Sequence, residues 1–405
     1  MTAAPTAPTP AKRAGKSAGV IAVQGLNSIN TVIQMALFAL TLPRTDFDDY
    51  AVWVTSGMFM IGLGQAIGTE RVVIGRRSFD DGTSTSGVIA LAVCAVQVGV
   101  SLALGSPALV IASLAFAPYA AYDFQRFTRC YDEAKRFLRV DLSVLVVECV
   151  AVLALWATLG RHAWLAVVWW VLGVLPWSRL AGREVLRLRR GVRVLRDDLH
   201  QCLPLLMDAA LAGVPLVVAL ALARAQGDVG DASAARMAFT ILGPVTVLGL
   251  SARRLVYAEV AKGPLSARFT AVWGGICVAT LVACALLLSL TRTPLYPWAF
   301  PGFVGLSWVA ILGFAVNHAA MFSTLLPAAS LRAEQRAREV GISRVIATGS
   351  AVVVGVLVLP FDSPADVAWC VAAGSIGYTV SLFAARLLTR SSIVPVPEAQ
   401  PEASA

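Results

Sequence analysis

Charged side chains are scarce in this 405-residue chain: they make up only 14% of it, whereas 58% of the residues are hydrophobic. Soluble domains carry about 25% charged residues. The low charge and a mean hydropathy of +0.74 exclude an ordinary soluble domain and indicate a membrane protein. The net charge of +9 does not predict a nucleic-acid partner, because the basic residues stand in short gaps between apolar runs instead of forming one basic domain.

Sequence motifs for metal binding and hydrolysis are also missing. The seven cysteines include no CxxC pair and nearly all fall inside apolar runs, which argues against a disulfide framework or a zinc site. There is no phosphate-binding glycine loop, no GxSxG and no metal-spaced cluster of His, Asp and Glu. We therefore expect no cofactor, and no transport driven by ATP hydrolysis in this chain alone.

Long apolar runs are abundant. A helix that spans a bilayer needs roughly 20 mostly apolar residues. Twelve runs approach or meet this length, the eighth being short: 18–42, 50–69, 87–105, 107–122, 141–160, 163–179, 200–223, 237–252, 269–290, 303–326, 345–360 and 366–388. The sequence therefore predicts an all-α polytopic membrane protein with about twelve transmembrane helices.

Basic residues alternate with these runs in a way that predicts the orientation. If the amino terminus is cytoplasmic, 28 of the 33 Lys and Arg residues fall in gaps on the cytoplasmic side, as the positive-inside rule requires. The most basic stretch, Arg179–Arg196, has seven arginines against one acid, Glu184. We expect this stretch and both termini to be cytoplasmic.

The basic stretch also divides the chain into two halves of six spans each. Both halves start from the same side, so they are expected to be parallel repeats with a cleft between them. The predicted organisation is a disordered tail at 1–17, a first six-helix bundle at 18–180, a connector at 181–198, a second bundle at 199–389 and a disordered tail at 390–405.

The segment Asp123–Arg139 lies between the fourth and fifth spans. Its apolar and basic residues recur at helical spacing, which predicts a basic amphipathic helix. Such a helix either lies in the membrane interface or extends the fourth span, and a solvated basic loop is the alternative.

Four amide side chains mark the first span. Gln24, Asn27, Asn30 and Gln34 step by three, three and four positions, so they share one face of a helix. Amides in a membrane face the bundle interior or a water-filled cavity. We expect them to line a substrate cavity, and hydrogen bonding between helices is the alternative.

Two acids lie deep within predicted spans. Asp208 is about eight residues into the seventh span, roughly 12 Å below the surface at 1.5 Å per residue, and Glu148 is at a similar depth in the fifth. An uncompensated carboxylate is costly at that depth, so both are candidates for coupling transport to a proton or cation. Pro204 and Pro215 flank Asp208 and are expected to loosen its helix.

Arginines at two matching helix ends are candidates for contacting substrate. Arg71 and the pair Arg253–Arg254 end the second and eighth spans on the cytoplasmic side. Arginines at the cytoplasmic entrance of each half would suit a diphosphate. The alternative is that these side chains reach to the membrane surface without any ligand.

The first hairpin resembles that of polysaccharide (Wzx-type) flippases of the MOP exporter superfamily. It reads LNSINTVIQMALFALTLPRTDFDDYAVWVTSGMFMIGLGQAIGTER. The shared features are a polar-faced first helix, a glycine-bearing second helix and a loop of acidic and aromatic residues followed by Tyr-Ala, here Asp46–Ala51. The family often has glycine before the tyrosine, and this chain has Asp49. The motif covers about the first 70 residues, and the two-bundle plan covers most of the chain.

The resemblance implies a bacterial cytoplasmic-membrane flippase. It would move sugar units linked to undecaprenyl diphosphate by alternating access, with the lipid-linked sugar, the bilayer and proteins of envelope-polysaccharide synthesis as partners. A cation- or proton-coupled antiporter of drugs or small solutes is the alternative within the same superfamily. An envelope polymerase or ligase would need a large external loop with acid and base residues, and the external gaps are short. We therefore expect a transporter and not an enzyme.

Overall fold

The structure, a computed structural model, describes residues 10–390 apart from 66, 68–77, 261–265, 295, 298–299, 301–302, 304 and 334–335. For some helical residues it describes the backbone alone. Every regular element within this part of the chain is helical, which confirms the all-α prediction.

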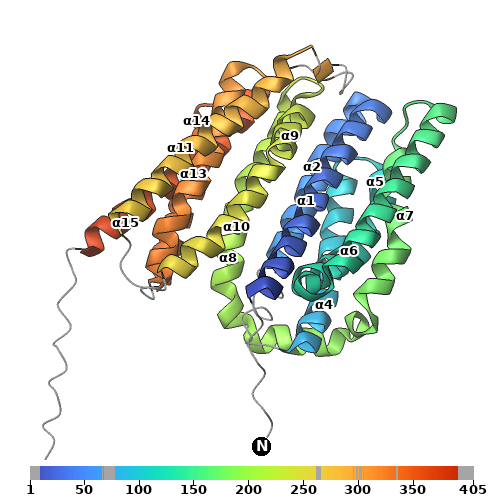
Figure 1. The fold of residues 1–405 in the computed structure, drawn as a ribbon. Helices are drawn as coiled ribbons and strands as arrows, with labels where there is room; N and C mark the ends of the chain where they lie inside the picture. The colour runs from blue at the N-terminus through green and yellow to red at the C-terminus, as the bar shows by residue number, and fades with distance from the viewer. Residues whose placement is uncertain are drawn as a thin grey trace, which may run out of the picture.

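The first half of the chain forms one bundle of long, roughly parallel helices (Figure 1). Its helices are α1 (Pro10–Thr41), α2 (Arg44–Gly64), α4 (Phe79–Ala103), α5 (Pro107–Ser113), α6 (Phe116–Leu159) and α7 (Trp164–Ala181). Its core contains a group of aromatic side chains. Trp53 is fully buried and packs edge-on against Phe116 at 4.8 Å and Trp170 at 5.5 Å between ring centroids.

The second half forms a second bundle beside the first (Figure 1). It follows the short helix η2 (Arg183–Leu186) and contains α8 (Leu188–Gln226), α9 (Asp231–Ile241), α10 (Gly243–Val260), α11 (Ala267–Ser289), η3 (Leu290–Arg292), α13 (Trp308–Ala333), α14 (Ala337–Leu357) and α15 (Pro364–Arg390). Among the described residues, the largest buried apolar cluster of the first half includes one buried side chain of the second, Met237. The largest cluster of the second half includes one of the first, Val52.

Nine of the described helical segments are long and apolar enough to cross a membrane. Within the described residues α1, α2 and the α9–α10 pair do not reach this threshold. All of these helices lie where the halves meet, together with the apolar span of α8, since α1 packs on α9 and α10, and α2 packs on α8 and α9. The more polar helices therefore face the other half of the molecule, where their side chains are spared contact with lipid.

The basic segment Asp123–Arg139 is helical and contains the kink between the fourth and fifth spans. It belongs to α6, which consists of two helices joined at a kink at Glu133 (φ −116°, ψ 24°), so that the part before the kink extends the fourth span and the part after it begins the fifth. A solvated loop is excluded, because the backbone is helical on both sides of this kink.

The irregular helix lies in the eighth span and not in the seventh. α8 stays helical through Pro204 and Pro215, so the prolines do not break the helix around Asp208. The break falls between α9 and α10 at Leu242 (φ −82°, ψ 0°). Gly243 and Pro244 follow it, and proline cannot donate the backbone hydrogen bond of a continuous helix.

The Arg-rich stretch is held against the first bundle. It comprises the end of α7, η2 and the start of α8, and crosses the lower end of the first bundle in Figure 1. Arg190 forms an ion pair of 2.9 Å with Asp81 of α4. Gly191 lies so close to α4 that a Cβ there would be 2.2 Å from the carbonyl oxygen of Ser84. Only glycine fits this approach.

Candidate functional site

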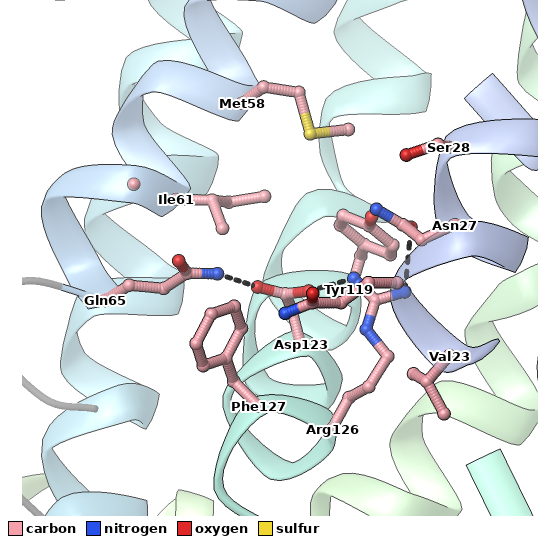
Figure 2. A pocket seen from close by; sticks show the side chains of 12 residues that line it. Val23, Asn27, Ser28, Met58, Ile61, Gln65, Tyr119, Asp123, Arg126 and Phe127 are labelled. Atoms are coloured by element: carbon pink, nitrogen blue, oxygen red, sulfur yellow. Dashed lines mark hydrogen bonds and ion pairs between the residues drawn. The ribbon is translucent and has the colours of Figure 1, made fainter. Parts of the chain in front are cut away.

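A polar cavity of about 200 Å³ lies in the first bundle between α1, α2 and α6 (Figure 2). Its lining residues are Val23, Gln24, Asn27, Ser28, Met58, Ile61, Gly62, Gln65, Tyr119, Asp123, Arg126 and Phe127. These three helices, with Gln65 after α2, thus supply amides, two hydroxyls, a carboxylate, a guanidinium and two aromatic rings to one small space.

Arg126 is the central cation of this cavity. Its side chain is almost buried and forms an ion pair with Asp123, one turn earlier on α6. It also donates a hydrogen bond of 2.8 Å to the Oδ1 atom of Asn27 on α1. The amide of Gln65, after α2, donates to the other carboxylate oxygen of Asp123. Figure 2 shows these groups converging from the three helices.

A second carboxylate lies behind Arg126. The Oδ2 atom of Asp141 is 3.6 Å from the guanidinium, and its Oδ1 atom accepts a hydrogen bond from the Tyr122 hydroxyl. Asp141 and Tyr122 are both buried. When ionised, the two acids place two negative charges around one positive charge, so the cluster is not a dedicated anion site.

The opposite end of α2 joins the two halves. Backbone N–H groups of Gly230 and Ser233 donate to the carboxylate of Asp48 at 2.6 and 2.9 Å. Arg224 of α8 donates to Asp49 at 2.7 Å. We call these five residues the outer latch. Asp48 caps the start of α9, where unpaired N–H groups favour an anion.

The latch and the cavity lie at different ends of the molecule. Asp48 and Gln65 are 17 residues apart, which is roughly 25 Å along a helix. The halves are therefore tied together at the end remote from the Arg-rich connector.

Burial raises the pKa of the Asp48 carboxyl, and the hydrogen bonds from Gly230 and Ser233 oppose this by lowering it.

No protein-family model and no curated protein matches the chain. Among solved structures it is similar to the lipid II flippase MurJ in an inward-closed conformation, with 14% identity, 90% of this chain and 87% of that chain covered, and a TM-score of 0.66. It is also similar to an inward-facing MATE multidrug-resistance transporter of the MOP superfamily, with 14% identity, 90% and 94% covered, and a TM-score of 0.59. A MOP-superfamily transporter from Pyrococcus furiosus matches with 12% identity, 92% and 94% covered, and a TM-score of 0.55. The chain shares the fold of these three transporters.

The four amide side chains predicted on one face of α1 do not all line the cavity. Gln24 and Asn27 line the cavity, whereas Asn30 and Gln34 are not among its lining residues. Gln34 is 6% exposed and Asn30 is partly buried. Only Gln24 and Asn27, the two amides nearer the amino terminus, line the cavity together with residues of α6.

Asp208 lies in the second bundle and has an ion-pair partner there. The Nε atom of Arg344 on α14 donates to its Oδ1 atom at 2.9 Å. The Arg344 guanidinium also stacks over the ring of Tyr378 at 3.6 Å. The two side chains are about a quarter exposed. Asp208 is thus part of a packed pair joining α8 to α14, away from the polar cavity.

Glu148 has no comparable partner. It is 1% exposed, and neither carboxyl oxygen has a hydrogen-bond partner among the described residues. It lies seven residues after Asp141 on α6, on the same face of the helix. A buried polar group left in this state is rare enough to need a functional or structural reason.

The three arginines predicted to contact a diphosphate have side chains outside the described part of the chain. Arg71 lies outside the described residues. Arg253 and Arg254 belong to α10, but their side chains are outside the described part of the chain. Their contact with a diphosphate stays a prediction.

No sequence pattern marked Arg126, Asp123, Gln65 or the outer latch as functional. Asp123 and Arg126 stand three apart, a spacing at which helical side chains pair. That signal was present, but in a segment predicted to be an amphipathic helix in the membrane interface, an extension of the fourth span or a solvated loop. The contacts that assemble the cavity join residues up to 99 positions apart.

Proposed function

We propose that this protein is a transporter that moves lipid-linked oligosaccharide across a bacterial cytoplasmic membrane by alternating access. The observation that supports it best is the chemistry of the polar cavity. Gln24 has an amide with both donors and an acceptor. Asn27 and Gln65 keep, respectively, the amide NH2 group and the carbonyl oxygen that are not used in their bonds to Arg126 and Asp123, and each Asp123 oxygen has further lone pairs beyond its bond to Gln65 or Arg126. Sugar hydroxyls also donate and accept, so a sugar matches this mixture better than a purely apolar or purely anionic ligand does.

Aromatic rings complete the match to a sugar. Tyr119 and Phe127 line the same cavity as the polar groups. Their faces can cover the apolar C–H surface of a sugar ring while the amides bind its hydroxyls. The likeness to a lipid II flippase supports the same class of substrate.

Arg126 is not proposed as the main diphosphate ligand, because Asp123 and Asn27 already occupy part of its hydrogen-bonding capacity. The diphosphate of a lipid-linked sugar would instead meet Arg71, Arg253 and Arg254 at the cytoplasmic mouth. The sugar would then enter the cavity while its lipid chain stays in the bilayer.

Alternating access requires one side to close while the other opens. The outer latch supplies contacts between the halves at the end of α2 away from the cavity. We propose that it holds the external side shut while substrate loads from the cytoplasm, and that it separates when the substrate is released outside. Glu148 is the preferred coupling residue, since Asp208 already has Arg344 as its partner.

A cation-coupled or cation-exporting antiporter is the second candidate. It is favoured by the excess of negative charge around Arg126, where Asp123 and Asp141 face one guanidinium. A cationic solute or a proton would neutralise this excess. The likeness to MATE transporters supports this alternative.

The chain offers a matched pair of variants that tests the cavity. Asn27→Ala removes an amide that lines it, whereas Asn30→Ala removes the same amide from the same helix outside its lining. In cells that depend on the protein for surface glycan, Asn27→Ala is expected to lower surface glycan and raise lipid-linked sugar on the cytoplasmic leaflet, and Asn30→Ala to do neither. Protein abundance is measured in both.

Deletion of the protein separates the two functions. The flippase proposal expects lipid-linked sugar to accumulate and surface glycan to be lost. Intact surface glycan together with greater sensitivity to cationic drugs would instead establish the antiporter.

A further inference from the structure

The connector between the two bundles has an exposed basic surface that the proposed transport function does not use. This surface is formed by η2 and the first turns of α8, which run across the ends of the long helices of the first bundle (Figure 1). Several of those long helices can span a bilayer. A helix that crosses their ends therefore lies roughly in the plane of the membrane surface.

The contact with α4 fixes how the start of α8 is turned about its axis. Gly191 faces α4, since a Cβ there would lie 2.2 Å from the carbonyl oxygen of Ser84. At about 100° per residue, three exposed arginines lie roughly 140° to 200° around the helix axis from Gly191: Arg189, Arg193 and Arg196. They are therefore on the face of the helix that is turned away from the bundle.

These three arginines have no counter-ion within the described part of the chain. None of their side chains forms an ion pair or a hydrogen bond with a described residue. The neighbouring Arg190 differs, because it is paired with Asp81 at 2.9 Å. Arg190 thus anchors the connector, and the other three leave three positive charges that no described residue neutralises.

Exposed apolar side chains border the three arginines. Leu188 and Val192 lie roughly 60° and 100° around the axis from Gly191, between the contact with α4 and the arginines. Val192 is 53% exposed, and Leu186 of η2 is 77% exposed. A helix that combines basic and exposed apolar faces is typical of the membrane interface, where a soluble acidic partner would not cover the apolar side chains.

We propose that this surface binds anionic phospholipids of the adjacent leaflet, which the basic excess predicts to be the cytoplasmic one. Leu186, Leu188 and Val192 enter the boundary between headgroups and acyl chains. The three arginines contact the headgroup phosphates, which suit the planar guanidinium, and each basic residue adds to the attraction toward an anionic leaflet. This lipid site goes beyond the proposed transport function and does not depend on which solute is moved.

Two positions on this helix provide a matched test. Val192 lies among the exposed apolar side chains, whereas Asp197 is exposed on the other side of the arginines. A spin label is attached at Val192→Cys or at Asp197→Cys in the cysteine-free, full-length chain. The protein is placed in nanodiscs of phosphatidylcholine with or without phosphatidylglycerol, and access of the label to oxygen and to a water-soluble nickel chelate is measured.

Phosphatidylglycerol is expected to increase the access of oxygen to the label at Val192→Cys and to decrease that of the nickel chelate. The label at Asp197→Cys should stay accessible to the chelate in both bilayers. High salt should weaken the response at Val192→Cys, because it screens exposed charges. An equal signal from Val192→Cys in the two bilayers would overturn the proposal.

Two triple variants test whether the connector arginines cause the response. The response should be lost when glutamine replaces all three arginines, in Arg189→Gln, Arg193→Gln, Arg196→Gln. It should persist when the same charge is removed from exposed positions of α6, in Lys135→Gln, Arg136→Gln, Arg139→Gln. A response that persists in the connector variant would overturn the proposal. A response to undecaprenyl diphosphate in phosphatidylcholine, with none to phosphatidylglycerol, would also overturn it and assign the surface to the transported lipid.

Discussion

At the scale of single residues, the polar cavity depends on how charges are balanced in a dry environment. Arg126 is 8% exposed and is held by Asp123 on its own helix, Asn27 on α1 and Asp141 behind it. Breaking a buried ion pair by removing one partner costs more than the pair contributes, because the remaining charge stays uncompensated. Arg126 is therefore as much a structural residue as a ligand.

Arg126→Gln is expected to lower the free energy of unfolding by about 3–5 kcal/mol, because it leaves the Asp123 and Asp141 carboxylates buried without a cation. Thermal unfolding of the purified protein in one detergent measures the loss. Adding Asp123→Asn to Arg126→Gln removes one of the two stranded charges and is expected to restore part of the stability. A single variant as stable as the wild type would show that water, and not Arg126, solvates the acids.

Glu148 and Asp208 are expected to differ when each loses its charge. Glu148→Gln breaks no described hydrogen bond, so the fold should be kept while transport loses its dependence on a proton gradient. Asp208→Asn weakens the pair with Arg344, and because both side chains are partly exposed, the loss is about 1 kcal/mol of stability with gradient dependence retained. Transport in vesicles with and without a pH gradient compares them. The opposite pattern would assign coupling to Asp208.

At the scale of helices, the sequence predicts where elements lie better than what they touch. Long apolar runs give the spans because a backbone in lipid must satisfy its own hydrogen bonds. The break at Leu242 also had a local signal in the Gly243–Pro244 pair. Partners across the fold had none, because the pairing of Asp208 with Arg344 joins residues 136 positions apart.

As the pH falls toward the pKa of the Asp48 carboxyl, a larger fraction of the molecules is expected to have the outer latch closed. When the latch is closed, burial raises the pKa of Asp48 above its ordinary value of 3.8, whereas an open latch exposes this carboxyl to water. The closed form thus binds the proton more tightly, and between the ordinary and the raised pKa acidification favours it. Spin labels at Thr45→Cys and Val229→Cys would report a shorter distance at lower pH.

Asp48→Asn provides the control for the latch. Its single amide oxygen can accept from Gly230 or from Ser233, which donate to different oxygens of Asp48, so one of the two bonds is lost in exchange for a side chain that does not titrate in this range. The distance between the labels should then be independent of pH. A pH response equal to that of the wild type would assign the effect to another group, with Asp231 the first to test because burial also raises its pKa.

At the scale of the whole molecule, the two-bundle arrangement follows from a few simple patterns. The sequence predicted the connector from its arginines, and the structure shows how it is anchored, through Arg190 and Asp81 on α4. The cavity could be predicted only in part. Spacing on α1 indicated a polar face, but which half of that face meets α6 depends on the packing of three helices.

The orientation of the molecule is the last prediction and the one on which cytoplasmic loading depends. The basic excess predicts that the connector is cytoplasmic and that the outer latch is external. Gly191 is unsuitable for a reporter cysteine because it packs against Ser84, whereas Arg193 is exposed and Val229, beside the latch, is 55% exposed. In a cysteine-free background, Val229→Cys should react with an impermeant thiol reagent in intact cells, and Arg193→Cys only after the cells are broken. Reaction of Arg193→Cys in intact cells would reverse the orientation, and with it the side from which the cavity is loaded.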